Sequence, residues 1–600
     1  VTFIDGDVGL DGQVSASNSL VGSSPGDSIG IQTSNTGITL LPGGNYVVSS
    51  PAWDAPGAPN AGAVTFGSGS TGVTGVVSAS NSLVGSREND FVGDDVYALA
   101  NGNFVVASGR WDRPLGQDVL INSGAVTWSS AAAPVIGPVS ESNSLVTDNR
   151  GSGGLSQVFG ITPLAQGNYV VSHVGWDNVP ASLVNAGAVR WAAGDAPLVG
   201  GLSALNAVTG AASEAQVGQT VVALADGNYV IASRNVAGNR GAVRWASGIA
   251  ASVGTLDASN SLVGTASGDS VGSGGVLPLP SGAYLVLSPQ WDRGGVNSVG
   301  ALSFGPAGVG LVGEISASNS LVGVQTADIN GGISSRVAVL GTGNYVYVAE
   351  GWDHGALVDA GAAVFGDGDT GVVGEISAAN ALIGSSAQDQ VGRTTLVAGT
   401  PGVVPLSNGH YVVNSAGWNN GAVADVGAAT WGHGESGVVG PITPANSLIG
   451  ARVGHALGGT LALTNGNYIV RSTNREDGLG ALGAVTWCDG NGPTSAVLDI
   501  GNSLMGSRFN DGVGSRMTAL ANGHYVVTSW DWNDGARTRA GAVTWGDGTQ
   551  GVSGLIDASN SFIGGRSDDR IGRTDLAAIA EGAFALPDGN YVVPSQYASV

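Results

Sequence analysis

The chain has no lysine and very little sulfur. All 21 of its basic residues are arginines, and its 600 residues include two methionines and a single cysteine, Cys488. The absence of lysine excludes Lys–Asn isopeptide crosslinks, and one cysteine cannot make an internal disulfide. The sequence also lacks a CxxC motif or Cys/His cluster that would hold zinc. Its stability must therefore come from packing and hydrogen bonds.

The sequence also lacks long hydrophobic runs, and its first residues include no initiator methionine. No apolar run approaches the roughly 18 residues of a membrane helix, so we expect no membrane span. Residues 1–3 include neither methionine nor part of a signal sequence, which predicts a processed chain or an excerpt of a longer one. The 45 acidic residues give a formal net charge of -24, and such a surface repels nucleic acid and anionic lipid.

Glycine is what the chain has in abundance. It contains 102 glycines, 42% of its residues are hydrophobic, and only 11% are charged. This composition is too apolar for a disordered chain and too rich in glycine for a helical protein. It predicts β structure with many turns.

One sequence unit recurs over the whole chain. The motif NSLVG, or a near variant, returns about every 60 residues. Its copies begin at Asn18, Asn81, Asn143, Asn206, Asn260, Asn319, Asn380, Asn446, Asn502 and Asn560. This spacing predicts a single array of about ten repeats over residues 1–600. We expect half-repeats at the two ends that could pair, and no separate linker domain.

Each unit reads as about four short strands. In residues 96–106, two β-prone runs flank Asn101-Gly102, a dipeptide that suits a tight hairpin turn. A GAVTW-type strand, a Gly-rich turn and a strand ending in NSLVG follow. Four antiparallel strands in a unit of this length are typical of propeller blades. We therefore predict an all-β fold of tandem four-stranded antiparallel blades of about 60 residues. The array is β-propeller-like, either a closed ring or a segment of a longer repeat array.

The motifs resemble two kinds of known repeat. Residues 90–93, DFVG, are similar to the FG element of the FG-GAP repeat of integrin α-subunit propellers, and residues 124–128, GAVTW, to its G-x-V-aromatic strand. The GAP tripeptide is absent. The combination of GAVTWG with SASNSLVGS also resembles repeats of very large secreted bacterial surface proteins. The resemblances imply propeller blades, an extracellular location and, from the FG-GAP repeats, calcium in Asp-rich loops.

Sequence features that would support catalysis are weak. The six histidines have no recurring partner, and His410 and His524 fill a turn position that is Asn in other repeats. The chain has no G-x-S-x-G motif for a nucleophilic serine. We therefore expect no enzyme activity.

Short acidic loops are the candidate metal sites. They place carboxylates on glycine bends, as calcium sites do, at Asp5, Asp7, Asp367, Asp369 and Asp547. None has a complete calcium-loop pattern, and plain turns are the alternative. A more regular acid follows NSLVG, and a carboxylate that accepts backbone N–H groups explains it without metal. It occurs at Asp27, Asp90, Asp269, Asp328, Asp389, Asp511 and Asp569.

The tryptophans fall into two sets. Those of the GAVTW strands alternate with phenylalanine between repeats, which predicts a core position between blades. The others lie in loops beside an aspartate, where an aromatic face and a carboxylate could bind a ligand or a second chain. These candidate residues are Trp53, Asp54, Trp111, Asp112, Trp176, Asp177, Trp291, Asp292, Trp352 and Asp353.

Two functions fit these features. The first is an extracellular, non-catalytic structural or adhesive protein of a bacterial surface fibre, sheath or adhesin stalk. The alternative is a closed propeller that binds a glycan or protein ligand. We expect the partners to be further copies of the chain or other surface proteins and glycans, with no nucleic acid.

Overall fold

A computed structural model describes residues 1–32, 36–147, 159–393, 402–472, 482–508, 510–574 and 582–598. The chain divides into two compact units, Val1–Val286 with Gly305–Ile315, and Leu287–Phe304 with Ser316–Val600. Within the described ranges the only helices are three short ones, η1 (Val179–Ala181), α1 (Val236–Asn239) and α2 (Ile333–Arg336). The rest is strands and turns, so the predicted all-β fold is confirmed.

The basic sheet of the repeat is an antiparallel meander. In the first complete sheet it consists of β2 (Ile38–Leu40), β3 (Tyr46–Ser50), β4 (Ala63–Gly67) and β6 (Ser82–Val84). Tyr46 pairs with Gly67, and Val64 pairs with Leu83. The four antiparallel strands that the sequence predicts for each unit are therefore confirmed here.

A fifth strand, which the sequence did not predict, joins most of the meanders from the following repeat. Strand β12 (Gly137–Pro138) pairs in parallel with β6, with Gly137 opposite Leu83. The same exchange places β5 (Gly75–Val76) on β1 (Leu20–Val21). Strands β5 and β12 each have only two residues and include glycine, so their composition resembles a turn. This added strand links consecutive repeats through backbone hydrogen bonds.

The first unit contains three further five-stranded sheets. One consists of β7 (Asp95–Ala98), β8 (Phe104–Ser108), β11 (Ala125–Ser129), β13 (Leu145–Val146) and β17 (Gly200–Gly201). The next consists of β14 (Gly160–Pro163), β15 (Tyr169–His173), β16 (Ala188–Ala192), β18 (Val208–Thr209) and β22 (Gly254–Thr255). The last consists of β19 (Thr220–Ala223), β20 (Tyr229–Ser233), β21 (Ala242–Ala246), β23 (Leu262–Val263) and β27 (Gly313–Glu314). A loop hairpin is formed by β9 (Arg113–Leu115) and β10 (Asp118–Leu120).

The division between the units falls within one repeat. Its strands are β24 (Gly275–Pro278), β25 (Tyr284–Ser288), β26 (Ala301–Gly305) and β28 (Ser320–Val322), with β32 (Gly374–Glu375) from the next repeat. In the second unit, β28 pairs in parallel with β32, and Leu321 lies opposite Gly374.

The second unit repeats the same plan. Its five-stranded sheets begin with β29 (Val337–Val339), β30 (Tyr345–Ala349), β31 (Ala362–Gly366), β33 (Ala381–Ile383) and β37 (Gly440–Pro441). The second consists of β34 (Val403–Pro405), β35 (Tyr411–Ser415), β36 (Ala428–Gly432), β38 (Ser447–Ile449) and β42 (Ala496–Val497). The third consists of β39 (Gly459–Ala462), β40 (Tyr468–Ser472), β41 (Ala484–Cys488), β43 (Ser503–Met505) and β47 (Gly554–Leu555). A four-stranded sheet and a hairpin follow, formed by β44 (Arg516–Ala519), β45 (Tyr525–Ser529), β46 (Ala542–Gly546) and β48 (Ser561–Ile563), and by β49 (Phe584–Ala585) and β50 (Tyr591–Val592).

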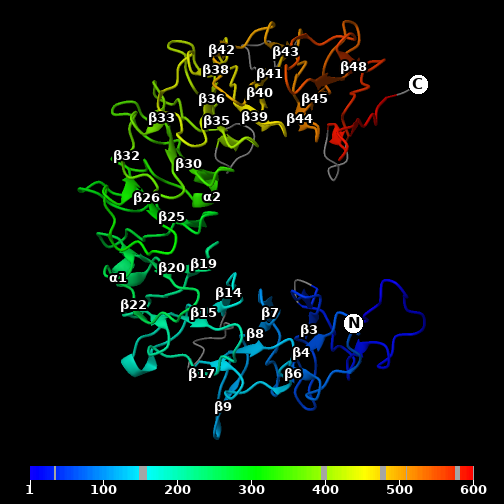
Figure 1. Ribbon diagram of the computed structural model, residues 1–600, viewed down its shortest axis with the longest axis vertical. Helices are drawn as coiled ribbons and strands as arrows, with labels where there is room; N and C mark the ends of the chain where they lie inside the picture. The colour runs from blue at the N-terminus through cyan, green and yellow to red at the C-terminus, as the bar shows by residue number, and fades with distance from the viewer. Residues whose placement is uncertain are drawn as a thin grey trace. The chain divides into compact units, whose positions relative to one another are not determined.

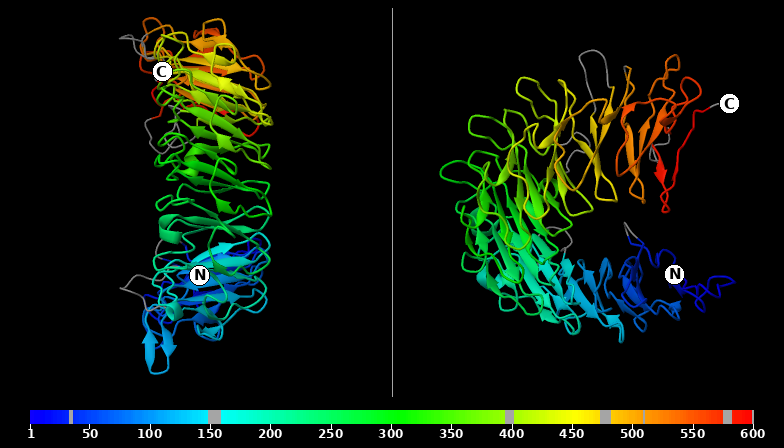
Figure 2. Two further views of the ribbon diagram at one scale, coloured as in Figure 1. Left: turned by 90° about the vertical axis from the view of Figure 1, so that its left-hand side faces the viewer. Right: turned by 45° about the horizontal axis from the view of Figure 1, so that its top comes forward.

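The sheets of a unit follow one another in chain order, as Figures 1 and 2 show for each unit by itself. Their central strands are buried on both faces: Val47 and Val48 are fully buried and belong to two different hydrophobic clusters. A run that is apolar on both strand faces is what a sheet packed between two neighbours requires.

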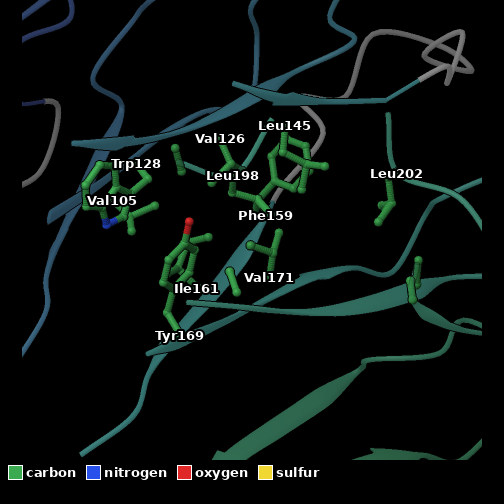
Figure 3. Packing of buried hydrophobic residues seen from close by; sticks show 14 of the residues in the cluster. Val105, Val126, Trp128, Leu145, Phe159, Ile161, Tyr169, Val171, Leu198 and Leu202 are labelled. Atoms are coloured by element: carbon green, nitrogen blue, oxygen red, sulfur yellow. The ribbon is translucent and has the colours of Figure 1, made fainter. Parts of the chain in front are cut away.

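The core lies between successive sheets. Figure 3 shows one such layer, where Val105 and Trp128 of one sheet face Ile161 and Tyr169 of the next. Tyr169 is fully buried and Trp128 is 7% exposed. The strand tryptophan therefore lies in the core between repeats at this position, as the sequence predicts.

Candidate functional site at the inter-repeat junctions

The junctions between repeats are built from the asparagine of the GNY turn. In the second unit, Asn467 Oδ1 accepts the N–H of Gly490 in its own repeat at 3.0 Å. Its Nδ2 donates to the carbonyl oxygen of Gly548 in the following repeat at 2.8 Å. One amide side chain thus fixes its own turn and holds the next repeat.

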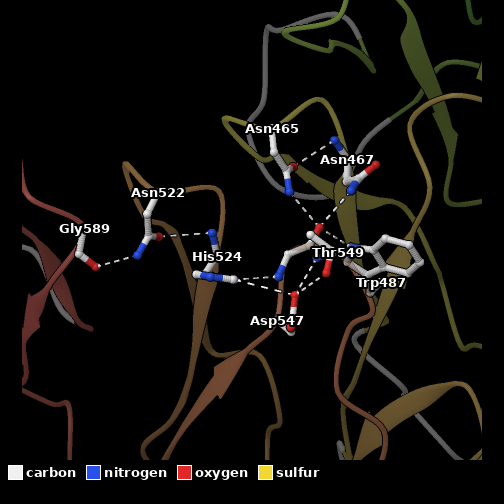
Figure 4. Close-up of polar contacts among 9 residues, drawn as sticks. Asn465, Asn467, Trp487, Asn522, His524, Asp547, Thr549 and Gly589 are labelled. Atoms are coloured by element: carbon white, nitrogen blue, oxygen red, sulfur yellow. Dashed lines mark hydrogen bonds and ion pairs between the residues drawn. The ribbon is translucent and has the colours of Figure 1, made fainter.

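The carbonyl of Gly548 is the acceptor of three donors (Figure 4). Besides Asn467, it accepts hydrogen bonds from Asn465 Nδ2 at 2.8 Å and Trp487 Nε1 at 3.0 Å. We call such a residue the junction glycine. The first unit has the same arrangement at Gly194, which accepts from Asn101, Asn103 and Trp128 at 2.7 to 2.9 Å. The junction is therefore a repeated, directional contact.

At some junctions a second glycine lies against the aromatic residue of the preceding repeat. A Cβ atom on Gly551 would lie 2.6 Å from the Cβ of Trp487, and one on Gly437 would lie 2.5 Å from the Cβ of Phe365. Both glycines have φ near +70 to +80°. At these two positions the close approach requires glycine.

Two histidines take the place of the junction asparagine. His524 Nδ1 accepts the N–H of Gly548, and His410 Nδ1 accepts the N–H of Gly434, each at 3.0 Å. This confirms that they occupy the asparagine turn position. Burial, followed by the nearby His433, lowers the pKa of His410. An imidazole nitrogen that accepts a hydrogen bond from a backbone N–H carries no proton, so the imidazole ring is neutral in this contact.

The regular acid after NSLVG closes its own loop, as predicted. Asp90 is fully buried, and its Oδ2 accepts the N–H groups of Ser86 and Arg87 at 2.9 and 2.8 Å. Its Oδ1 accepts the N–H of Asp112 at 3.0 Å. Burial raises the pKa of Asp90, and these backbone bonds oppose that rise. The same two-bond loop forms at Asp27, Asp269, Asp328, Asp389 and Asp511.

The candidate calcium ligands make turn contacts. Asp5 Oδ1 accepts the N–H of Asp7 at 2.9 Å, and Asp367 Oδ1 accepts the N–H of Asp369 at 2.9 Å. Asp547 Oδ1 accepts both the N–H and the hydroxyl of Thr549 at 2.7 Å. In the part of the chain that the structure describes, no three His, Cys, Asp or Glu residues lie close enough together to hold a metal ion. Calcium at these loops remains a prediction.

The loop tryptophans are buried, which corrects the expectation that they present an exposed aromatic face. Their exposed fractions are between 1% and 4%, for Trp53, Trp111, Trp176, Trp291 and Trp352. The search for Trp-Asp pairs in the sequence also missed two equivalent tryptophans, Trp418 and Trp532. They are 2% and 3% exposed and are followed by asparagine instead of aspartate. A search for Trp-Asn in the same loop would have found them.

The paired aspartates shape their loops. Asp54 Oδ1 accepts the N–H of Asn60 at 2.8 Å, and Asp353 Oδ1 accepts that of Asp359 at the same distance. The equivalent bonds of Asp112, Asp177 and Asp292 go to the N–H groups of Asn122, Asn185 and Ser298. In each Trp-Asp pair, therefore, the tryptophan is part of the core and the aspartate stabilises the loop through a backbone hydrogen bond. A ligand-binding role for these residues stays a prediction.

Comparison with known proteins identifies the repeat but gives it no function. A family model described as a repeat of unknown function (DUF5650) matches ten segments, residues 1–31, 40–94, 98–153, 163–219, 223–273, 278–332, 339–393, 405–459, 462–515 and 519–573. No curated protein matches. No helix among the described residues has the length and hydrophobicity to cross a membrane.

One similar solved structure is a crystal structure of a eukaryotic initiation factor, with 9% identity over 79% of this chain and 88% of that one. Its TM-score of 0.28 is too low to support an argument. The ten family matches cover most of the sequence and agree with the repeated sheets. The chain therefore belongs to the family of proteins built from the DUF5650 repeat.

Proposed function

We propose that this chain is an extracellular structural or adhesive repeat protein, without catalytic activity, that contributes to a bacterial surface fibre, sheath or adhesin stalk. The observation that carries the proposal is the repeated junction. At each described junction of this type, a glycine carbonyl accepts side-chain donors from the preceding repeat, as Gly194 and Gly548 do.

Three features of the junction suit a load-bearing array. The parallel fifth strand joins neighbouring sheets through the backbone, the aromatic ring packs on a glycine of the next repeat, and the side-chain bonds are directional. In a linear array each repeat depends mainly on its neighbours, so stability grows with the number of repeats. The net charge of -24 keeps so apolar a chain in solution.

The location is tested by treating intact cells of the source organism with protease. We expect the protein to be cleaved while a cytosolic marker protein stays intact. Release of the protein only after cell lysis would contradict an extracellular role. The uncleaved marker serves as the control for cell integrity.

Assembly is tested by light scattering on the purified 600-residue chain over a hundredfold range of concentration. A fibre or sheath protein is expected to increase in mass with concentration, because weak sites act together in an assembly. A chain that stays monomeric throughout would contradict self-assembly and favour the alternative of a ligand-binding module.

A further inference from the structure

Two histidines lie against each other at one junction of the second unit. The ring centroids of His410 and His433 are 4.7 Å apart, and that of Trp431 is 4.8 Å from His410. His410 comes directly before β35, and His433 directly after β36. All three side chains are partly buried. The two imidazole rings therefore share one site that is partly screened from water.

The Nδ1 atom of His410 holds the junction glycine of this repeat. It accepts the N–H of Gly434 at 3.0 Å. The carbonyl oxygen of Gly434 accepts Asn344 Nδ2 at 2.8 Å and the hydroxyl of Thr342 at 3.1 Å, both from the preceding repeat. His410 thus fixes the glycine to which the preceding repeat is bonded. The contact requires a neutral ring, because a protonated Nδ1 cannot accept a hydrogen bond.

The second histidine opposes protonation of the first. His433 Nδ1 accepts the N–H of Glu435 at 3.2 Å, so this ring is also neutral in its contact. If both rings took up a proton, two positive charges would lie side by side, and like charges at this distance repel each other. Most of the equivalent positions in the second unit carry aspartate instead, at Asp367, Asp489 and Asp547.

The charged groups around the pair come from three turns. Glu435 lies in the same turn as His433, and the corresponding turns of the preceding and following repeats carry Asp367 and Asp489. Burial, followed by His433, lowers the pKa of His410, and Glu435 opposes this to a smaller extent. Asp367 and Asp489 accept backbone N–H groups of their own turns. The surroundings of His410 therefore favour its neutral form.

The other histidine junction has the opposite partner. Oδ1 of Asp547 lies 3.7 Å from His524 Nδ1, which also accepts the N–H of the junction glycine (Figure 4). Trp545 packs on His524 with centroids 4.8 Å apart, as Trp431 does on His410, so the aromatic contact is common to both junctions. A proton on His524 is offset by the neighbouring carboxylate, because a charged donor and a carboxylate form a strong hydrogen bond.

We propose that the junction at His410 and His433 is an acid-sensitive contact between two repeats. Uptake of a proton by His410 breaks its hydrogen bond to Gly434 and loosens the hold of that glycine on the preceding repeat. Because the pKa of His410 is lowered from its ordinary value of 6.5, the contact is complete above pH 6.5 and is lost as the pH falls below that value. The inference does not depend on whether the chain forms a fibre.

The test is hydrogen exchange of the full chain at pH 7 and pH 5, corrected for the intrinsic rate at each pH. Mass spectrometry reads the peptides that contain Gly434 and Gly548. We expect protection at Gly434 to fall about threefold to tenfold more than protection at Gly548, which is the range that one hydrogen bond contributes. An equal fall at both glycines would overturn the proposal.

Two variants locate the response, and each introduces a side chain that other repeats already carry at that position. His410→Asn matches Asn344 and Asn467, and should remove most of the pH response at Gly434, because an amide oxygen accepts the N–H at either pH. His433→Asp reproduces the pair of His524 with Asp547 and should reduce the response. Circular dichroism at pH 7 checks that both variants fold. A response in His410→Asn as large as in the wild type, or an undiminished one in His433→Asp, would also overturn the proposal.

Discussion

The contacts of single side chains explain why the same residues recur in the repeat motifs. The threonine of GAVTW and the serine of NSLVG form a buried hydroxyl pair between adjacent strands, as Thr65 and Ser82 do at 2.7 Å. The asparagine of the same motif holds the preceding turn, since Asn81 Nδ2 donates to the carbonyl of Val76 at 2.9 Å. Buried hydroxyl groups need such partners, because an unpaired buried polar group costs free energy.

One buried residue makes local stability depend on pH. His173 is buried against Phe159, with ring centroids 4.9 Å apart, and burial lowers its pKa to about 4. Its unfolded value is 6.5, so below that pH the unfolded state takes up a proton that the folded state does not. The stabilisation is complete above pH 6.5 and is lost as the pH falls toward 4. Between pH 7 and pH 5 we expect a loss of about 2 kcal/mol.

The measurement is hydrogen exchange of β14 to β16, corrected for the intrinsic rate at each pH. The control variant is His173→Ser, because serine fills the same strand position at Ser108 and Ser233. The wild type should lose about 2 kcal/mol more local stability than the variant over this pH range. Equal losses would show that His173 is not the titrating group.

The burial of the loop tryptophans gives a second prediction at this scale. Trp111 is 1% exposed, whereas Trp545 on β46 is 44% exposed. Trp111→Ser should therefore destabilise its repeat by about 3 to 5 kcal/mol, and Trp545→Ser by much less. Limited proteolysis of the two variants compares them directly. Similar protease resistance of both would contradict a core role for Trp111.

At the scale of the element, the hairpin turn depends on glycine. Gly102, between β7 and β8, has φ of 88°, which a β-branched residue adopts only with strain. Gly102→Val should destabilise that repeat by about 1 to 3 kcal/mol. The matched control is Gly341→Ala, in the equivalent turn before β30, where φ is not positive and a Cβ meets nothing within 4 Å.

The comparison is made by hydrogen exchange of the two hairpins. Faster exchange of β7 and β8 in Gly102→Val, with unchanged exchange of β29 and β30 in Gly341→Ala, is the expected result. Unchanged exchange in Gly102→Val would mean that the turn can adopt another conformation at little cost.

At the scale of the whole molecule, the acidic loops predict the response to metal removal. Their oxygens already accept backbone N–H groups, and hydrogen bonds from Asp369 and Thr370 lower the pKa of Asp367. We expect a chelator to change the melting temperature by less than about 2 °C. Removing a metal ion lowers the melting temperature only where that ion is bound to the folded protein. A fall of many degrees that added calcium reverses would establish a structural calcium site.

Local chemistry made the repeat predictable. Tight turns at glycine, strand-forming aliphatic runs and a fixed period are properties of neighbouring residues, so the hairpin at Gly102 and the closed loop at Asp90 follow from the letters. The sequence alone therefore determined the all-β class and the ten-fold repetition. Its prediction for the strand tryptophans is confirmed at Trp128, which is 7% exposed, and is wrong at Trp545, which is 44% exposed.

Contacts between distant residues decided the rest. The two-residue parallel strand β12 exists only because β6 of the preceding repeat offers a free edge, and Trp111 is buried only because its loop folds over the sheet. The sequence determines the strands and turns of each repeat. The packing of one repeat on another determines which side chains are buried and which charged groups lie close together.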